Sequence, residues 1–230
     1  MSFQKATREQ RIPKIGLLGP AGSGKTKGAL LLMEGIIGDK PYVVLDTENY
    51  SSSIYANKHD FSVCDLSDVV VSPKIIKEKM EEALKEGFKG IIIDSATPAW
   101  DYLVDMSNKT EGNSFQNWGK TFTPIQRDFI KYINKFPVPV ICTIRQESQY
   151  VIETNDKGKM VPKKVGLKAQ QGKGLEFELD LVFAIDQSTH KARIDKGRYE
   201  ELEQYFDEQG GEVKLTKEVG QLLRKTFKGE

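Results

Sequence analysis

The segment from Gly19 to Thr26 constrains this chain more than any other, because it matches the phosphate-binding pattern G-x-x-x-x-G-K-[ST] at every fixed position. An apolar run at residues 12–18 precedes it, and residues 27–37 follow with apolar side chains at helical spacing. A strand, a glycine-rich turn and a helix in this order let backbone N–H groups surround a polyphosphate at the positive end of the helix. The alternative is a glycine-rich turn with a chance lysine. With both flanking elements in place, the sequence predicts a nucleoside triphosphate site.

Each part of the motif has an expected role. Lys25 is expected to reach the β- and γ-phosphates, and the Thr26 hydroxyl to complete the coordination of Mg²⁺. The predicted ligands are therefore ATP and Mg²⁺. The predicted nucleotide-binding residues are Gly19, Pro20, Ala21, Gly22, Ser23, Gly24, Lys25 and Thr26.

Apolar strands alternate with helices along the chain. The expected strands cover residues 12–18, 42–45, 91–93 and 137–144, and the expected helices cover residues 27–37, the stretch from Ser72-Pro73 to Gly87, and the stretch after Thr123-Pro124. Ser72 and Thr123 are the predicted N-caps of the last two helices. Continuous apolar strands separated by helices are typical of a parallel sheet that is covered on both faces. The predicted fold class is α/β with a mostly parallel central sheet. A length of 230 residues favours one such domain with insertions.

Acidic residues follow two of the expected strands, where ligands of parallel sheets bind. Asp94 ends the run 91–93 and has the position of the acid that holds the hydration shell of Mg²⁺. A cap for the next helix is the alternative. Glu48, the outer acid of Asp46-Thr47-Glu48, is the predicted general base that orients or deprotonates the attacking water. A solvated turn is the alternative for that segment.

Composition excludes some classes of protein. The net charge is +1, so no overall field favours nucleic acid or membrane, and any basic surface is local. The two cysteines, Cys64 and Cys142, lie in or beside apolar runs, which is typical of reduced thiols in a cytoplasmic protein. No apolar run approaches the ~18 residues of a membrane span. The expected location is the cytoplasm, that of the host if the chain is phage-encoded.

Two stretches of the sequence resemble the RecA recombinases. Residues 43–49, VVLDTEN, resemble the family's second strand, which is followed by Asp-x-Glu with the catalytic glutamate, and residues 91–95, IIIDS, resemble its apolar strand ending in Asp-Ser. With a short N-terminus and no large appended domain, the chain is most similar to small phage-encoded RecA-like ATPases. The resemblance covers residues 12 to about 200 and implies a DNA-binding ATPase of recombination or single-strand annealing, with a single-strand-binding protein as a partner.

The same resemblance implies further site residues. A polar residue after the strand 137–144 senses the γ-phosphate in the family; here it is Arg145 or Gln146, and Gln146 is the preferred candidate. An expected antiparallel hairpin, residues 179–186 and 190–195, leads to Lys196 and Arg198, which resemble the basic fingers that RecA-like subunits insert into a neighbour's site. A cation there would neutralise charge on the transferred phosphoryl group. A solvated basic turn is the alternative.

Fingers that act on a neighbour imply a homo-oligomer, because head-to-tail contacts close into a ring or continue as a filament. The stretch 3–6, FQKA, resembles the Phe-x-x-Ala tether between RecA-like subunits. The expected organisation is therefore an N-terminal tail at residues 1–11, an ATPase domain at 12–200, and a helical segment at 201–230 that packs on the core through an amphipathic stripe.

Two polar insertions are the candidate binding segments for single-stranded DNA. Residues 107–122 combine Lys109 and Lys120 with Phe115, Trp118 and Phe122, a combination that can stack bases and screen phosphates. Residues 147–174 hold a local excess of lysine, with a hairpin expected around 155–158. The lysines are Lys157, Lys159, Lys163, Lys164, Lys168 and Lys173. Packing anchors and a soluble strand edge are the alternatives.

Other functions fit the sequence less well. His59 and His190 lack companions at metal-ligand spacing and are interpreted as ordinary residues. A small-molecule or nucleotide kinase shares the phosphate loop and Asp94 but does not need Glu48. A nucleotide-gated adaptor that loads another protein on DNA would tolerate loss of Glu48.

Overall fold

The computed structural model describes residues 5, 11–110, 118–154, 160–169 and 175–228. Its strands are β1 (Lys14–Gly19), β2 (Val43–Asp46), β3 (Ser62–Asp65), β4 (Ile91–Asp94), β5 (Val140–Thr154), β6 (Met160–Ala169), β7 (Leu181–Ile185) and β8 (Ala192–Lys196). Its helices are α1 (Lys25–Ile37), α2 (Pro73–Lys85), α3 (Thr97–Lys109), α5 (Thr123–Lys135), α6 (Leu175–Glu178), α7 (Glu200–Glu208) and α8 (Lys217–Lys228), with short helical turns η2 (Ser51–Tyr55) and η3 (Trp118–Phe122).

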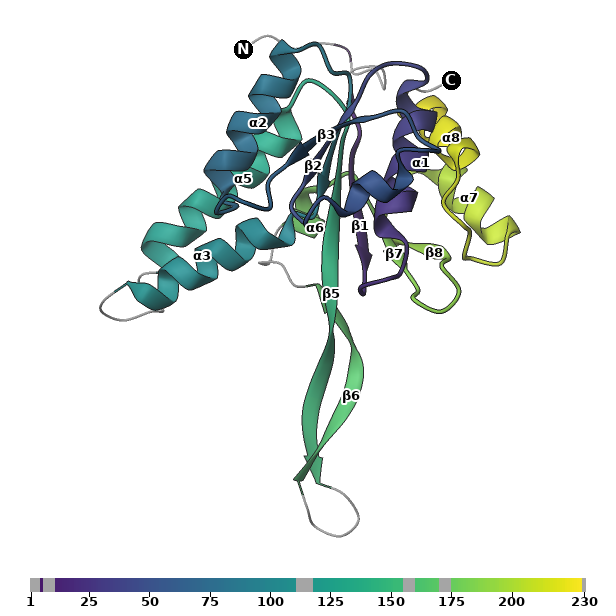
Figure 1. The fold of residues 1–230 in the computed structure, drawn as a ribbon. Helices are drawn as coiled ribbons and strands as arrows, with labels where there is room; N and C mark the ends of the chain where they lie inside the picture. The colour runs from purple at the N-terminus through teal and green to yellow at the C-terminus, as the bar shows by residue number, and fades with distance from the viewer. Residues whose placement is uncertain (1–4, 6–10, 111–117, 155–159, 170–174, 229–230) are drawn as a thin grey trace.

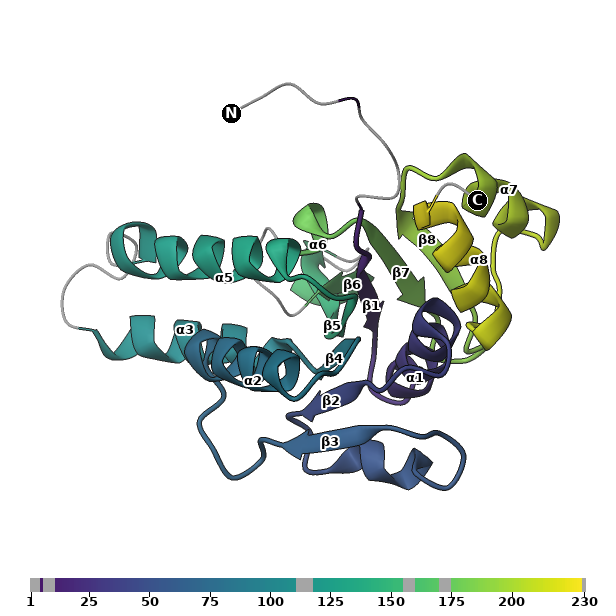
Figure 2. The same ribbon diagram turned by 90° about the horizontal axis from the view of Figure 1, so that it is seen from above.

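The strands form one sheet in the order β3-β2-β4-β5-β1-β7-β8, and β6 pairs with β5 outside this path. Neighbours from β3 to β7 are parallel, whereas β8 is antiparallel to β7. Helices α2, α3 and α5 cover one face, and α1, α7 and α8 cover the other (Figure 2). The predicted fold class, a mostly parallel sheet between two helical layers with a C-terminal antiparallel hairpin, is confirmed.

Each face of the sheet has its own apolar core, because successive side chains of a strand point to opposite faces. In β4, Ile92 belongs to the core beneath α1 and α8, and Ile91 and Ile93 belong to the core beneath α2 and α5. Strands that are apolar at every position are therefore buried on both sides, as their sequences predict.

Helix α8 packs on α1 through two glycines. A Cβ atom on Gly35 would lie 2.2 Å from the carbonyl oxygen of Lys217, and one on Gly220 would lie 2.5 Å from that of Leu32. The backbones of the two helices therefore approach more closely than side chains allow. Along α8, Val219, Leu223 and Phe227 fill the core of this face.

Strand β5 continues far beyond the core and forms a two-stranded ribbon with β6 (Figure 1). Its first residues pair with β1 and β4, and from Gln146 to Thr154 it pairs only with β6. The ribbon leaves the sheet at the carboxyl ends of the parallel strands. The hairpin expected in this insertion is thus present, and its turn at 155–158 lies outside the described residues, as do Phe115, Lys157, Lys159 and Lys173.

Helix starts agree with the sequence in one case and differ in another. The Ser72 hydroxyl accepts a hydrogen bond from the Ile75 N–H at 3.3 Å and caps α2, as predicted. Thr123 does not cap α5, because it is already helical and its hydroxyl donates to the carbonyl of Trp118.

At the chain start, Phe3, Gln4 and Ala6 of the predicted tether lie outside the described residues. Within the described part of the chain, none of the helices is long and apolar enough to cross a membrane.

Candidate nucleotide site

The phosphate-binding segment lies between the end of β1 and the start of α1, as predicted. Gly22 and Gly24 have φ angles of 76° and 94°, a left-handed conformation that favours glycine. A Cβ on Gly22 would meet no heavy atom within 4 Å, so the loop is open there. The Ser23 hydroxyl is buried, and among the described residues it has no hydrogen-bond partner. An open loop with an unsatisfied buried hydroxyl fits a polyphosphate.

Lys25 is held inside the loop that it belongs to. Its Nζ donates to the carbonyl oxygens of Gly19 and Pro20, at 3.0 and 2.9 Å. Burial lowers the pKa of this ammonium, and the nearby carboxylates of Glu48 and Asp94 act in the opposite direction. These two carbonyl oxygens keep the ammonium at the phosphate-binding loop. Phosphate oxygens can take their place as hydrogen-bond acceptors.

Thr26 and Asp94 meet at the ends of α1 and β4. The Thr26 hydroxyl donates to Asp94 Oδ2 at 2.7 Å, and the Thr143 hydroxyl of β5 donates to the other carboxylate oxygen. Asp94 is 1% exposed, and burial raises its pKa, although both hydroxyl hydrogen bonds favour the ionised form. Hydroxyl and carboxylate oxygens are ligands that Mg²⁺ prefers. Among the described residues there is no group of three or more His, Cys, Asp or Glu side chains that could hold a metal ion.

The two acids after β2 have different surroundings. Asp46 is fully buried and accepts hydrogen bonds from the backbone N–H groups of Glu48 and Ser52, both at 2.8 Å. It therefore organises the turn. Glu48 lines a cavity of about 360 Å³ together with Lys25 and Thr26. The outer acid thus lies at the phosphate-binding loop, as its position in the sequence predicts.

Arg145 also lines this cavity, whereas Gln146 is not among its lining residues. The register of β5 explains the difference, because Arg145 pairs with Gly19 at the end of β1, and Gln146 pairs with Ala169 at the base of the ribbon. The Arg145 N–H donates to the Thr97 hydroxyl at 3.0 Å, which fixes the backbone there. The polar residue at the nucleotide cavity is thus Arg145.

Lys196 and Arg198 lie at the opposite edge of the sheet. Lys196 pairs with Val182 at the start of β7, and Val182 pairs with Gly16 near the start of β1. The Lys196 ammonium donates to the carbonyl of Leu179 at 2.7 Å, and burial lowers its pKa. The structure does not bring these two residues to the phosphate-binding loop of their own chain.

The described aromatic residues of the insertion 107–122 pack on one another. The Trp118 ring lies edge-on to Trp100 at 4.9 Å between centroids and stacks on Phe122 at 5.9 Å. Phe122 is buried, whereas Lys109 and Lys120 are exposed. In this conformation Trp118 and Phe122 anchor η3 to α3, and the lysines remain available at the surface.

Sequence reasoning missed the contact between the β7–β8 turn and the phosphate-binding loop. Gln187 Nε2 donates to the Ala21 carbonyl at 2.8 Å, and His190 Nδ1 lies 3.2 Å from the Ser23 carbonyl. His190 was interpreted as an ordinary residue. The two segments come together because β7 pairs with β1, and no local sequence pattern predicts that pairing.

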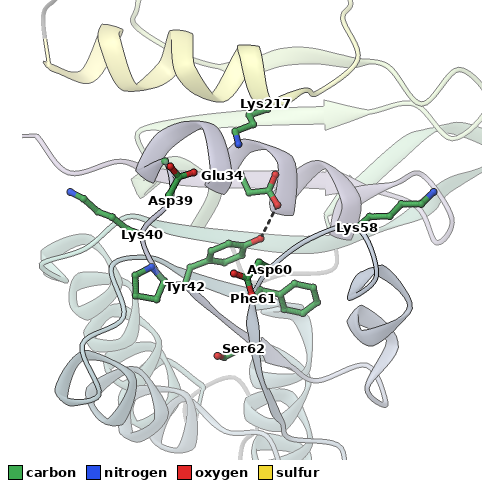
Figure 3. A pocket seen from close by; sticks show the side chains of 11 residues that line it. Glu34, Asp39, Lys40, Tyr42, Lys58, Asp60, Phe61, Ser62 and Lys217 are labelled. Carbon is green, nitrogen blue, oxygen red and sulfur yellow. Dashed lines mark hydrogen bonds between the residues drawn. The ribbon is translucent and has the colours of Figure 1, made fainter.

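A separate cavity of about 390 Å³ lies at the other end of α1 (Figure 3). The Tyr42 hydroxyl donates to Glu34 Oε1 at 3.4 Å, and His59 Nδ1 lies 2.7 Å from the same oxygen. Burial and the neighbouring Glu34 raise the pKa of Tyr42. This cluster ties α1 to the segment after η2 and does not belong to the nucleotide site.

The fold and the site together define a P-loop NTPase. A family model described as an AAA domain matches residues 11–220, and the chain belongs to this family. The crystal structure of the RadB recombinase is similar over 82% of this chain and 84% of that chain, with 16% sequence identity and a TM-score of 0.48. Among proteins with curated functions, none matches this chain in sequence.

Proposed function

We propose that this protein binds and hydrolyses ATP with Mg²⁺, and that single-stranded DNA stimulates the reaction. One observation carries the proposal of hydrolysis. The Glu48 carboxylate lines the same cavity as Lys25 and Thr26, and Asp94 is hydrogen-bonded to Thr26. A base beside the γ-phosphate position distinguishes a hydrolase from a kinase, whose base must act on a second substrate.

In this proposal the chain positions charge and removes a proton. The loop N–H groups and the Lys25 ammonium bind the β- and γ-phosphate oxygens, and Thr26 and Asp94 would hold Mg²⁺. Bound Mg²⁺ neutralises charge on these phosphates. Glu48 accepts the proton of the attacking water, and Arg145 contributes positive charge on the same side of the cavity.

We assign single-stranded DNA binding to the β5–β6 ribbon and to the lysines of the η3 insertion. In the ribbon register, Lys163 and Lys164 stand opposite Val151 and Tyr150, and Lys168 stands opposite Glu147. An isolated two-stranded ribbon is marginally stable in water, so a partner that covers it is expected. The ribbon begins at Gln146, directly after the residue at the nucleotide cavity, which offers a short path between DNA and ATP.

Assembly into a ring or filament completes the proposal. Lys196 and Arg198 lie at the sheet edge opposite the phosphate-binding loop of their own chain, so in this proposal they act on the site of a neighbouring chain. Residues 12–200 would form the ATPase unit, with the tail 1–11 as a tether. The expected role is DNA recombination or strand annealing in the cytoplasm, that of the host if the chain is phage-encoded, with a single-strand-binding protein as a partner.

Steady-state ATP hydrolysis by the full chain, with and without single-stranded DNA at two salt concentrations, tests this function. Stimulation that weakens as salt rises is expected, because phosphate contacts release counterions. The double variant Lys163→Glu with Lys164→Glu should abolish stimulation by DNA and leave the basal rate unchanged. The control double variant Lys85→Glu with Lys89→Glu changes two exposed lysines outside the ribbon and should leave both the stimulation and the basal rate unchanged. A rate indifferent to DNA would refute the DNA part and lead to a screen of phosphoryl acceptors for a kinase.

A further inference from the structure

A second cavity, of about 460 Å³, adjoins the phosphate-binding loop on the side of α1. It shares Gly22, Gly24 and Tyr55 with the cavity that contains Glu48, so the two cavities are neighbours at the loop. We propose that it binds the nucleoside part of the nucleotide, and that His190 selects adenine by accepting a hydrogen bond from its 6-amino group. The inference rests on the proposed ATPase function and adds the origin of base specificity.

The walls of this cavity suit a flat, partly apolar ring. Leu31 of α1, Ile185 at the end of β7 and Leu215 supply apolar surface, and Tyr55 supplies an aromatic ring. Gly28 lets the Leu215 side chain lie directly against α1, since a Cβ there would be 2.9 Å from Leu215 Cδ1. Lys27 and Lys214 also line the cavity, and an ammonium group is a hydrogen-bond donor for ribose and phosphate oxygens.

The turn that carries His190 is fixed on both sides. The Asp186 carboxylate accepts hydrogen bonds from the Ser188 hydroxyl, from the Thr189 hydroxyl and from the N–H groups of both residues. These contacts lower its pKa to about 2. Gln187 binds the Ala21 carbonyl of the phosphate-binding loop. His190 is therefore held at a defined place beside Gly22 and Gly24 rather than on a free loop.

The contact with Ser23 determines which atoms of His190 remain for a ligand. A backbone carbonyl only accepts hydrogen bonds, so Nδ1, 3.2 Å from the Ser23 oxygen, carries the proton. In the neutral ring Nε2 then has a free lone pair and acts as an acceptor. Adenine presents an amino donor at its 6-position, and guanine or hypoxanthine presents an oxygen acceptor there. The neutral ring therefore favours adenine and repels the keto bases.

Calorimetric titration of the full chain with ATP, ITP and inorganic tripolyphosphate, each with Mg²⁺, tests the inference. ITP replaces the 6-amino group of ATP by an oxygen, and tripolyphosphate has no nucleoside. The wild-type chain should bind ATP about 10- to 100-fold more tightly than ITP, because the keto oxygen loses one hydrogen bond and faces a lone pair. It should bind tripolyphosphate more weakly than either nucleotide.

Two variants separate selection from packing. His190→Phe keeps a ring of similar size and should bring the affinities for ATP and ITP to within about 3-fold of each other. Tyr55→Ala should weaken the binding of ATP and of ITP by the same factor, so the ratio of the two affinities should stay as in the wild type. An ATP preference that survives His190→Phe would overturn the role of His190. Equal wild-type affinity for all three probes would overturn the base site while leaving the phosphate site intact. Failure of every probe to bind would instead refute the proposed NTPase itself.

Discussion

Arg145 Nε lies 2.9 Å from Glu48 Oε1, so the predicted catalytic base forms an ion pair with a residue of β5, the strand that continues into the ribbon. The two side chains come from β5 and from the turn after β2, and both are partly exposed. An arginine has five donors in a planar fork, so it can bind this carboxylate and a phosphate oxygen together. The pair therefore connects the base, the nucleotide and the ribbon.

Replacing Glu48 with Gln should lower kcat for ATP hydrolysis at least about 10²-fold, because the amide cannot accept the proton of the attacking water. ATP affinity should change little, since Lys25 and the loop bind the phosphates. Stopped-flow and steady-state assays of the full chain measure both quantities, with Glu86→Gln, an exposed acid far from the cavity, as the control. A near-normal rate would exclude Glu48 as the base.

Arg145→Ala should reduce the preference of the protein for ATP over ADP, because only ATP carries the phosphate that the guanidinium can contact. The hydrolysis rate should fall at least about tenfold as well. Gln146→Ala, one residue further along β5, should leave both quantities within about threefold of the wild type. Competition binding with ATP and ADP measures the preference. The opposite ranking of the two variants would return the sensing role to Gln146.

The parts of the site that the sequence predicts are those set by local pattern and by parallel-sheet geometry. Residues 19–26 are contiguous, and Glu48 and Asp94 follow apolar strands whose carboxyl ends meet at one edge. Arg145 and Gln146 could not be separated, because the choice depends on the register of β5 against β1. The contact of His190 with Ser23 depends on which strand lies beside β1 and has no local sequence signal.

Mixing Arg198→Ala chains with Glu48→Gln chains should restore ATP hydrolysis that neither variant has alone. Arg198 is exposed at the sheet edge opposite the nucleotide cavity, so a role in hydrolysis would require it to act on a neighbouring chain. At a 1:1 ratio about a quarter of the interfaces would combine an intact Glu48 with an intact Arg198. Activity measured across mixing ratios tests this. A rate that stays at the sum of the separate variants at every ratio would exclude a finger acting between chains.

Gly220→Ala should destabilise the protein by about 1–3 kcal/mol, because the new Cβ would lie 2.5 Å from the Leu32 carbonyl and 2.9 Å from Gly35 Cα. Both neighbours are backbone atoms, so α8 itself must move. Gly119→Ala is the matched control, since a Cβ there meets no heavy atom within 4 Å, and its stability should stay within about 0.5 kcal/mol of the wild type. Urea unfolding of both variants gives the comparison, and equal stabilities would contradict the close packing of α8 on α1.

Lys14 should make the stability of the protein depend on pH above about 8. Its side chain is 2% exposed, its Nζ donates to the carbonyls of Phe136 and Val138, and burial lowers its pKa to about 8. Below about pH 8 Lys14 is protonated in the folded state, and burial of its ammonium lowers the free energy of unfolding. Between about pH 8 and the ordinary lysine pKa of ~10.4 the unfolded chain binds more protons, so stability rises with pH.

Relative to Lys14→Met, the wild type should therefore gain about 1–2 kcal/mol of unfolding free energy between pH 8 and 9.5. The difference between the two chains removes the contributions of all groups that titrate alike in both. Lys85→Met, a change at an exposed lysine, keeps Lys14, so the wild type should show no such gain relative to this variant. Urea unfolding across this range measures the three curves. Parallel curves for the wild type and Lys14→Met would mean that Lys14 has the same proton affinity in the folded and unfolded states.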